Sequence, residues 1–187
     1  MAKDKERRGV LLVAATELEL CGHDGLVCGV GPVEAGISVA SALAEKRPRA
    51  VLHVGIAGAQ RLTPGALVIG TEAVYVDLAA EVTVVDRAAA DAGLVEAVQR
   101  ALPEAVALPI ATSAAVSIGH GSAHDLRVEG MEGFGVLRAC ELAGVPAVEV
   151  RAVSNELGEV DRALWMVRRG LDTLADAIPR LLAGLGD

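Results

Sequence analysis

The chain has 187 residues, enough for one domain with a substantial core, and its 17 basic and 25 acidic residues give a formal net charge of −8. Its 52% hydrophobic content and mean hydropathy of +0.45 exclude a disordered chain. The acidic balance opposes attraction to phosphate backbones and anionic membranes, so neither nucleic acid nor a membrane is expected as a partner. Aromatic residues make up only 2%, so Ala, Val, Leu and Ile must build the core, which favours an α/β fold.

The cysteines and the N-terminal residues bear on location. Cys21, Cys28 and Cys140 are an odd number without Cys-x-x-Cys spacing, so neither a disulfide framework nor a zinc site is predicted. Residues 1–8 carry charges of both signs and lead into a short apolar run, which fits neither a signal peptide nor a membrane span. We therefore expect a solvated arm over residues 1–8, a single domain over residues 9–187 and a reducing, cytoplasmic environment.

Apolar runs bounded by Gly, Pro and charged residues predict alternating strands and helices, with no linker or repeat that would divide the chain. Pro32 suits the first position of a helix that we expect to pack through Ile37, Ala40, Ser41 and Ala44. In chain order, strands are predicted over residues 9–15, 26–28, 50–54, 67–76, 81–85, 105–117 (with an interruption at Pro109) and 147–155, and helices over residues 32–46, 94–102, 133–144 and 161–182.

Polar side chains stand at the ends of several of these elements. Glu132 lies where a loop enters a helix, and Asn155 follows an apolar strand, which is where open α/β sheets place their ligands. Taken singly, each has a structural interpretation, because a glutamate in the first helical turn compensates the helix dipole and a Ser-Asn pair after a strand caps a turn. Together they predict a site.

Other stretches add weaker candidates. Glu17 and Glu19 follow the first strand, and the Gly-x-x-Gly stretch over residues 55–59 is expected to form a turn whose backbone amides approach a ligand. His120 lies in a glycine-rich loop over residues 118–122, where it either contacts a purine base or is merely exposed. Trp165 is either core or a pocket wall.

Several motifs, in this order along the chain, resemble those of the nucleosidase branch of the purine nucleoside phosphorylase superfamily, and within that branch those of the futalosine hydrolases of a menaquinone pathway. They span most of the chain. The motifs are Ala14-Ala15-Thr16-Glu17-Leu18-Glu19, Gly29-Val30-Gly31-Pro32, Val54-Gly55-Ile56-Ala57-Gly58, Met131-Glu132-Gly133, Arg151-Ala152-Val153-Ser154-Asn155 and Asp161-Arg162…Trp165.

The resemblance implies a three-layer α/β/α fold with a mixed, barrel-like central sheet, a homodimer, and cleavage of an N-ribosidic bond without metal or organic cofactor. It implies Glu19 as the base that activates water, with Glu17 as the alternative, and Glu132 as the group that binds the ribose hydroxyls. The further residues that it implies are Met131 under the ribose, Ala57 and Gly58 along the base and ribose, Ser154 and Asn155 at the purine edge, and His120 in place of the aromatic residue on which relatives often stack the purine.

Asn155 bears on the leaving base, because relatives that act on adenine derivatives have Asp at this position. An amide is no acid, but its NH₂ can donate to N7 and O6, the two acceptors on that edge of a 6-oxopurine. This favours hypoxanthine, although a flipped amide would also pair with adenine.

Water is favoured over phosphate as the nucleophile. The phosphorylases of the superfamily hold phosphate with an Arg and a Ser where this chain has His53 and Ile56, and a dianion would be poorly compensated here. The alternatives are a methylthioadenosine-type nucleosidase, a phosphorylase, and a nucleoside-binding protein without turnover.

Overall fold

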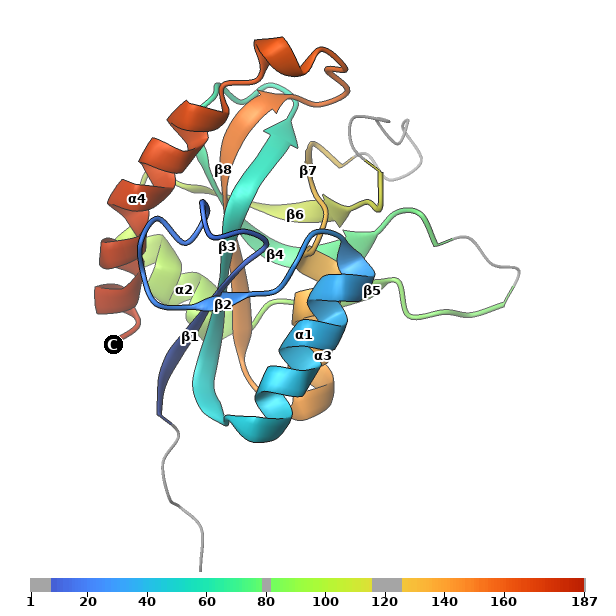
Figure 1. The fold of residues 1–187 in the computed structure, drawn as a ribbon, viewed down its shortest axis with the longest axis vertical. Coiled ribbons are helices and arrows are strands. Elements are labelled where there is room, and N and C mark those ends of the chain that lie inside the picture. Colours follow the sequence, from blue (N-terminus) through green and yellow to red (C-terminus); the bar gives the residue numbers. More distant parts are fainter. Residues whose placement is uncertain (1–7, 79–81, 116–125, 187) are drawn as a thin grey trace, which may run out of the picture.

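The computed structural model describes residues 8–78, 82–115 and 126–186, and its centre is a mixed sheet of eight strands (Figure 1). Five strands pair in a closed ring, each hydrogen-bonded to the next. One strand of this ring is long enough to pair with three neighbours, and through the third neighbour it links the ring to the rest of the sheet. The ring consists of β3 (Pro48–Ala59), β8 (Ala147–Glu156), β4 (Leu67–Tyr75), β6 (Val106–Thr112) and β7 (Val128–Gly130); β1 (Arg8–Ala14) and β2 (Leu26–Val27) extend it from β3, and β5 (Arg87–Ala89) from β4.

Helices cover the sheet on two sides (Figure 1). α1 (Pro32–Glu45) and α3 (Gly133–Ala143) lie against each other on one side, and α2 (Ala92–Ala101) and α4 (Val167–Gly184) lie on the other. Each helix pair buries its own apolar cluster against the strands. The predicted three-layer α/β/α fold with a barrel-like mixed sheet is therefore confirmed.

The packing side of α1 differs from the prediction. Ile37, Ala40, Ser41 and Ala44 are exposed, and the helix instead buries Ala35, Val39 and Leu43. The reason is a close crossing with α3, where a Cβ on Gly135 would lie 2.1 Å from the carbonyl oxygen of Pro32. Only a glycine in α3 permits this approach, and it sets which side of α1 faces inward.

Three strand predictions also need correction. Residues 55–59 form no turn; β3 continues through them, with a shift in its pairing with β8 between Ala57 and Gly58. Residues 82–85 form no strand, and β5 begins at Arg87 because it pairs with β4 as a hairpin. β6 passes through Pro109 without interruption, because the facing stretch of β4 has a register shift between Gly70 and Ala73 where the missing proline N–H would have donated.

The ends of the chain follow the prediction in part. The last predicted helix begins later, at Val167, after a short 3-10 turn, η1 (Arg162–Leu164). Of the predicted solvated arm, residues 1–7 lie outside the described residues, and Arg8 begins β1. None of the helices in the described ranges has both the length and the apolar character needed to cross a membrane.

Candidate active site

A pocket of about 310 Å³ opens where β1, β3, β7 and β8 end, beside the first turn of α3. Its size suits a small-molecule ligand. It is lined by Ala15, Thr16, Leu18, Glu19, Val30, Ile56, Ala57, Gly58, Ala115, Glu129, Gly130, Met131, Glu132, Arg151, Ser154, Asn155, Leu157, Gly158, Trp165, Val167 and Leu171.

Seven of the eight residues that the motifs nominated line this one pocket, although they come from distant parts of the sequence. Their catalytic and binding roles stay predictions. His120 lies outside the described residues, so its predicted contact with the base has no structural counterpart. The seven are Glu19, Ala57, Gly58, Met131, Glu132, Ser154 and Asn155.

Glu19 reaches the pocket from the loop after β1. Its Oε1 accepts a hydrogen bond from the backbone N–H of Ile56 at 3.0 Å, and its Oε2 accepts one from the hydroxyl of Thr16 at 2.8 Å. The residue is 7% exposed, whereas Glu17 is exposed and absent from the pocket lining. Of the two predicted bases, Glu19 is therefore the one whose position suits the role.

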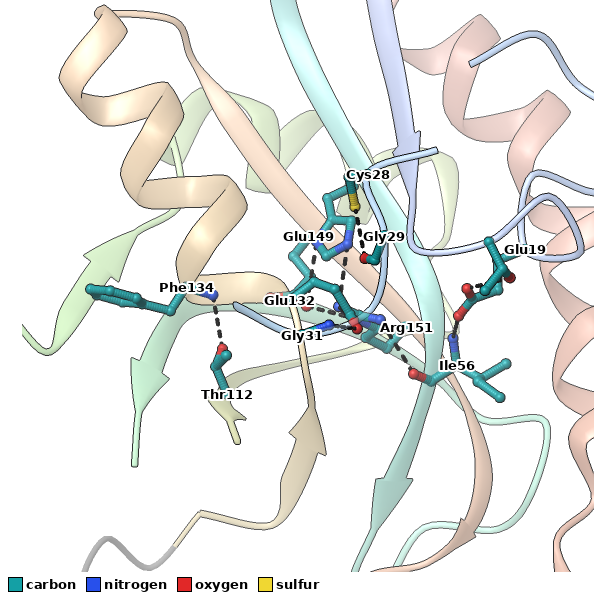
Figure 2. Close-up of polar contacts among 12 residues, drawn as sticks. Glu19, Cys28, Gly29, Gly31, Ile56, Thr112, Glu132, Phe134, Glu149 and Arg151 are labelled. Atoms are coloured by element: carbon teal, nitrogen blue, oxygen red, sulfur yellow. Dashed lines mark hydrogen bonds and ion pairs between the residues drawn. The ribbon is translucent and has the colours of Figure 1, made fainter. Parts of the chain in front are cut away.

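Glu132 is the N-cap of α3 but makes no side-chain cap bond to its own helix. Its carboxylate instead accepts a hydrogen bond from the backbone N–H of Gly31, 3.1 Å from Oε1, and pairs with Arg151, whose Nη2 lies 3.2 Å from Oε2 (Figure 2). The glutamate is thus held from the β2–α1 turn and from β8, with only 4% of its surface exposed.

Arg151 is the site residue that the sequence reasoning quoted in a motif but gave no role. It lines the pocket and is buried together with His53 on the neighbouring strand β3 and Glu149 on its own strand β8. The sequence-based prediction includes His53 only as the position that a phosphate-binding Arg has in the phosphorylases, and it does not include Glu149. The available signal was the sequence Glu149-Val150-Arg151, because two charged residues that are two positions apart on an otherwise apolar strand point to the same side of the sheet. Two like-facing charges in a buried strand require partners.

Burial and neighbouring charges shift the pKa values of the ionisable groups in and around this buried group. Burial and the positive Arg151 hold the pKa of His53 well below its usual value, so the imidazole is neutral. Burial raises the pKa of Glu149 against the opposing effect of Arg151. Burial also raises the pKa of Cys28 to about 12, with a further contribution from Glu132, so this thiol stays protonated at neutral pH and is a poor nucleophile.

The end of β8 fixes the amide of Asn155. Its Nδ2 donates to the carbonyl oxygen of Glu156 at 3.0 Å, and its Oδ1 lies 2.7 Å from the hydroxyl of Ser154. A flipped amide would bring its oxygen against that carbonyl, acceptor to acceptor, so the observed orientation is the stable one. One N–H of the amide has no acceptor among the described residues and is available to a ligand.

The side of the pocket toward α4 is apolar. Leu171, Val167, Leu157 and Leu18 contribute to it, together with Trp165, which is the single aromatic lining residue in the described ranges. The indole N–H of Trp165 donates to the carbonyl oxygen of Glu159 at 3.1 Å, so its ring is held in place. Trp165 is therefore a pocket wall rather than core.

The described residues of the pocket do not form a metal-binding site. Across residues 8–78, 82–115 and 126–186, no group of three or more His, Cys, Asp or Glu side chains is arranged to hold a metal ion. The pocket offers two buried carboxylates, an arginine that is already paired, and an amide. Two carboxylates can stabilise positive charge and exchange protons, and an amide can donate and accept hydrogen bonds.

Comparison with known proteins agrees with the motifs. The phosphorylase superfamily model matches residues 25–183. The futalosine hydrolase of Streptomyces coelicolor is 36% identical over 184 residues, covering 86% of this chain and 78% of the relative. That of Thermus thermophilus is 30% identical over 183 residues, covering 86% and 81%.

Solved structures share the fold at lower sequence identity. A mutant futalosine hydrolase of Helicobacter pylori superposes with a TM-score of 0.81 at 16% identity, covering 94% of this chain and 99% of that one. The 5′-methylthioadenosine/S-adenosylhomocysteine nucleosidase of Neisseria meningitidis gives 0.79 at 20% identity, covering 92% and 97%. From its motifs, its fold and these relatives, the chain belongs to the phosphorylase superfamily and, within it, to the futalosine hydrolase family.

Proposed function

We propose that the protein is a nucleosidase that hydrolyses the N-ribosidic bond of futalosine, releasing hypoxanthine and a ribosyl product. The observation that carries this proposal is the pocket in which two buried carboxylates, Glu19 and Glu132, lie together with the anchored amide of Asn155. The curated relatives, both futalosine hydrolases, support the choice of substrate. The proposal uses no metal or organic cofactor, because these side chains supply the charges and proton transfers required.

Glu132 is assigned to the ribose. Breaking a ribosidic bond builds positive charge on the sugar, and a carboxylate beside it stabilises that charge. Each oxygen of Glu132 already accepts one hydrogen bond, from Gly31 or from Arg151, and retains lone pairs for the ribose hydroxyls. Met131, the preceding residue, supplies an apolar surface under the sugar.

Glu19 is assigned as the general base. The donors on its two oxygens, from Ile56 and Thr16, fix the position of the carboxylate. A carboxylate held in this way can accept a proton from a water molecule as that water attacks the sugar. The base and the cation-stabilising group are then two different carboxylates, each with its own support.

Asn155 is assigned to the purine edge, together with Ser154, Ala57 and Gly58. The carbonyl oxygen of Glu156 holds the amide so that an N–H, rather than the oxygen, is left to donate. A 6-oxopurine presents acceptors at N7 and O6 and is matched by this donor, whereas the N6 amino group of adenine would need an acceptor. Hypoxanthine is thus the favoured leaving base. His120 stays a candidate for a contact with it.

Phosphate is disfavoured as the nucleophile. The side chain of Ile56 offers it no donor, and His53 is neutral and buried. The guanidinium of Arg151 is already paired with Glu132 and Glu149, so a phosphate dianion would meet carboxylates without a spare cation. Water carries no such charge.

A homodimer is part of the proposal. Val33 and Ile37 on the outer side of α1 are 68% and 64% exposed, and the neighbouring Val30 and the more distant Leu18 are exposed while also lining the pocket. Apolar side chains gathered at a pocket rim suit burial against a second copy of the chain. The free cysteines fit a cytoplasmic enzyme, and the role in menaquinone biosynthesis depends on futalosine being the substrate.

The substrate assignment is tested by chromatography of the bases released from futalosine, inosine, aminodeoxyfutalosine and methylthioadenosine, each with and without phosphate. We expect hypoxanthine from futalosine at a rate that phosphate does not change. Faster release of adenine from methylthioadenosine than of hypoxanthine from futalosine would instead indicate a methylthioadenosine-type nucleosidase, and a requirement for phosphate would indicate a phosphorylase. Binding of hypoxanthine by calorimetry with no release from any nucleoside would indicate a binding protein.

The roles of the carboxylates are tested by single changes to glutamine. Glu19→Gln and Glu132→Gln should each lower kcat/KM for futalosine by about 100-fold or more, because each removes a charge that the reaction uses. Glu17→Gln is the matched control and should keep full activity, since Glu17 is exposed outside the pocket. Full activity of either pocket variant, with thermal unfolding unchanged, would contradict its assigned role.

The dimer is tested by sedimentation equilibrium. The wild type should have twice the mass of one chain, and Ile37→Glu should shift the protein toward the monomer, because a buried charge would be left unpaired. Leu142→Glu, at the other end of the neighbouring helix α3, is the control and should leave the mass unchanged. A wild type that sediments as a monomer at micromolar concentration would rule the dimer out.

A further inference from the structure

Behind the pocket, four ionisable side chains are buried together: His53, Glu132, Glu149 and Arg151, none more than 4% exposed. His53 on β3 is directly opposite Glu149 on β8, and Gly55 is opposite Arg151, so the three side chains share one side of this strand pair. Glu132 and Arg151 line the pocket, whereas His53 and Glu149 do not. The last two therefore form a layer that a bound nucleoside would not touch.

Both members of this layer contact the guanidinium of Arg151. Its Nε donates to Oε1 of Glu149 at 2.7 Å, and its Nη2 lies 3.3 Å from Nε2 of His53 and 3.2 Å from Oε2 of Glu132. Its Nη1 donates to the carbonyl oxygen of Ile56 at 3.3 Å. Because a guanidinium is planar and donates in fixed directions, partners on three nitrogens leave it a single pose.

The contact with His53 also fixes a tautomer. Arginine nitrogens only donate, so Nε2 of His53 must accept, and the ring proton is on Nδ1. Nδ1 lies 3.6 Å from Oε1 of Glu149, which is the nearer carboxylate. A protonated ring would direct an N–H at the guanidinium.

Glu149 further connects the arginine to the helix that begins after Glu132. A Cβ on Gly133, the first residue of α3, would lie 2.3 Å from Oε2 of Glu149, so the carboxylate is packed directly against the first helical turn. That oxygen has no hydrogen-bond partner among the described residues. The positive end of the helix dipole is the favourable place for such a carboxylate.

Releasing Arg151 would have a specific consequence. A Cβ on Gly55 would lie 2.2 Å from Nη1 of Arg151 and 2.9 Å from Oε1 of Glu19, so the guanidinium and the assigned general base both approach the same side of this glycine. An arginine that lost its rear partners would be free to move between Glu132 and Glu19, because both carboxylates attract it. By holding Arg151 at Glu132, His53 and Glu149 keep the guanidinium from pairing with Glu19.

We propose that His53 and Glu149 are positioning residues, which hold Arg151 in the one pose that fixes Glu132 for the ribose and leaves Glu19 free to act as the base. The proposal rests on the proposed function for the roles of Glu132 and Glu19. It adds that catalytic competence depends on two side chains that never touch the substrate.

The test compares Glu149→Leu and His53→Leu, each of which removes an acceptor for Arg151, with the wild type, using futalosine turnover and hypoxanthine binding by calorimetry. Each variant should lower kcat by about 10- to 100-fold, the size expected when a reacting group is misplaced by up to about an ångström, with a smaller change in KM. Hypoxanthine lacks the ribose and should bind each variant within about twofold of the wild-type affinity, because Ser154 and Asn155 are unaffected. His53→Gln, whose Oε1 can accept from Arg151, should recover most of the activity. Glu72→Gln, which alters an exposed ion pair with Arg87, is the control and should behave as wild type.

The tautomer gives an independent readout. In ¹⁵N-histidine spectra, His53, identified by its absence in His53→Gln, should be neutral with the proton on Nδ1 and unchanged from pH 6 to 8. Among the described residues, the charged groups that face it are Arg151, at Nε2, and Glu149, at Nδ1, with Glu132 on the same guanidinium nitrogen of Arg151. A protonated ring, or a proton on Nε2, would overturn the proposed contact.

The two proposals fail in different ways. Full kcat of both Glu149→Leu and His53→Leu in an enzyme that cleaves futalosine would overturn the positioning role alone. A parallel loss of hypoxanthine affinity and turnover would also overturn it, since that would indicate general damage to the pocket. A wild type that neither binds hypoxanthine nor cleaves any nucleoside would overturn the proposed function itself.

Discussion

The site depends on the ion pairs that the buried Arg151 makes with Glu149 and Glu132. Removing a guanidinium from water costs several kcal/mol, and only close partners offset that cost. Here Glu149 and Glu132 pair with it, and together with Glu19 they raise its pKa despite burial, so it stays charged. The arginine in turn joins β8, β3 and the start of α3. The same contacts that make its burial tolerable determine where Glu132 stands in the pocket.

The side chains of β8, including this arginine, explain why residues 55 and 58 are glycines. The stretch continues β3, and its glycines leave room for polar side chains of β8: Arg151 crosses Gly55, and the amide of Asn155 lies against Gly58, with 2.9 Å between Nδ2 and the position of a Cβ. Strand and side chains therefore interlock. Polar side chains of β8 therefore extend from Glu149 behind the pocket, through Arg151, to Ser154 and Asn155 at the purine edge of the proposed site.

The sequence predicts the elements and the polar residues at their ends well, because apolar runs mark strands and because Glu19, Glu132 and Asn155 each follow or precede such a run. It does not predict the buried side chains that hold these residues in place, because the pairing of His53 with Glu149 joins two strands that are almost 100 residues apart in the sequence. The packing side of α1 fails for a related reason. Alanines occur all around that helix, and the crossing with Gly135, which decides the side, is not local.

The central claim for function is that the anchored amide of Asn155 selects a 6-oxopurine, and one ratio tests it most directly. Futalosine and aminodeoxyfutalosine differ only at C6, so the ratio of their kcat/KM values isolates that contact. We expect kcat/KM to be about 10- to 100-fold higher for futalosine, the difference that one matched purine contact gives. In Asn155→Asp, we expect the preference to reverse in favour of aminodeoxyfutalosine. Equal kcat/KM values for the two substrates in the wild type, or an unchanged ratio in the variant, would contradict it.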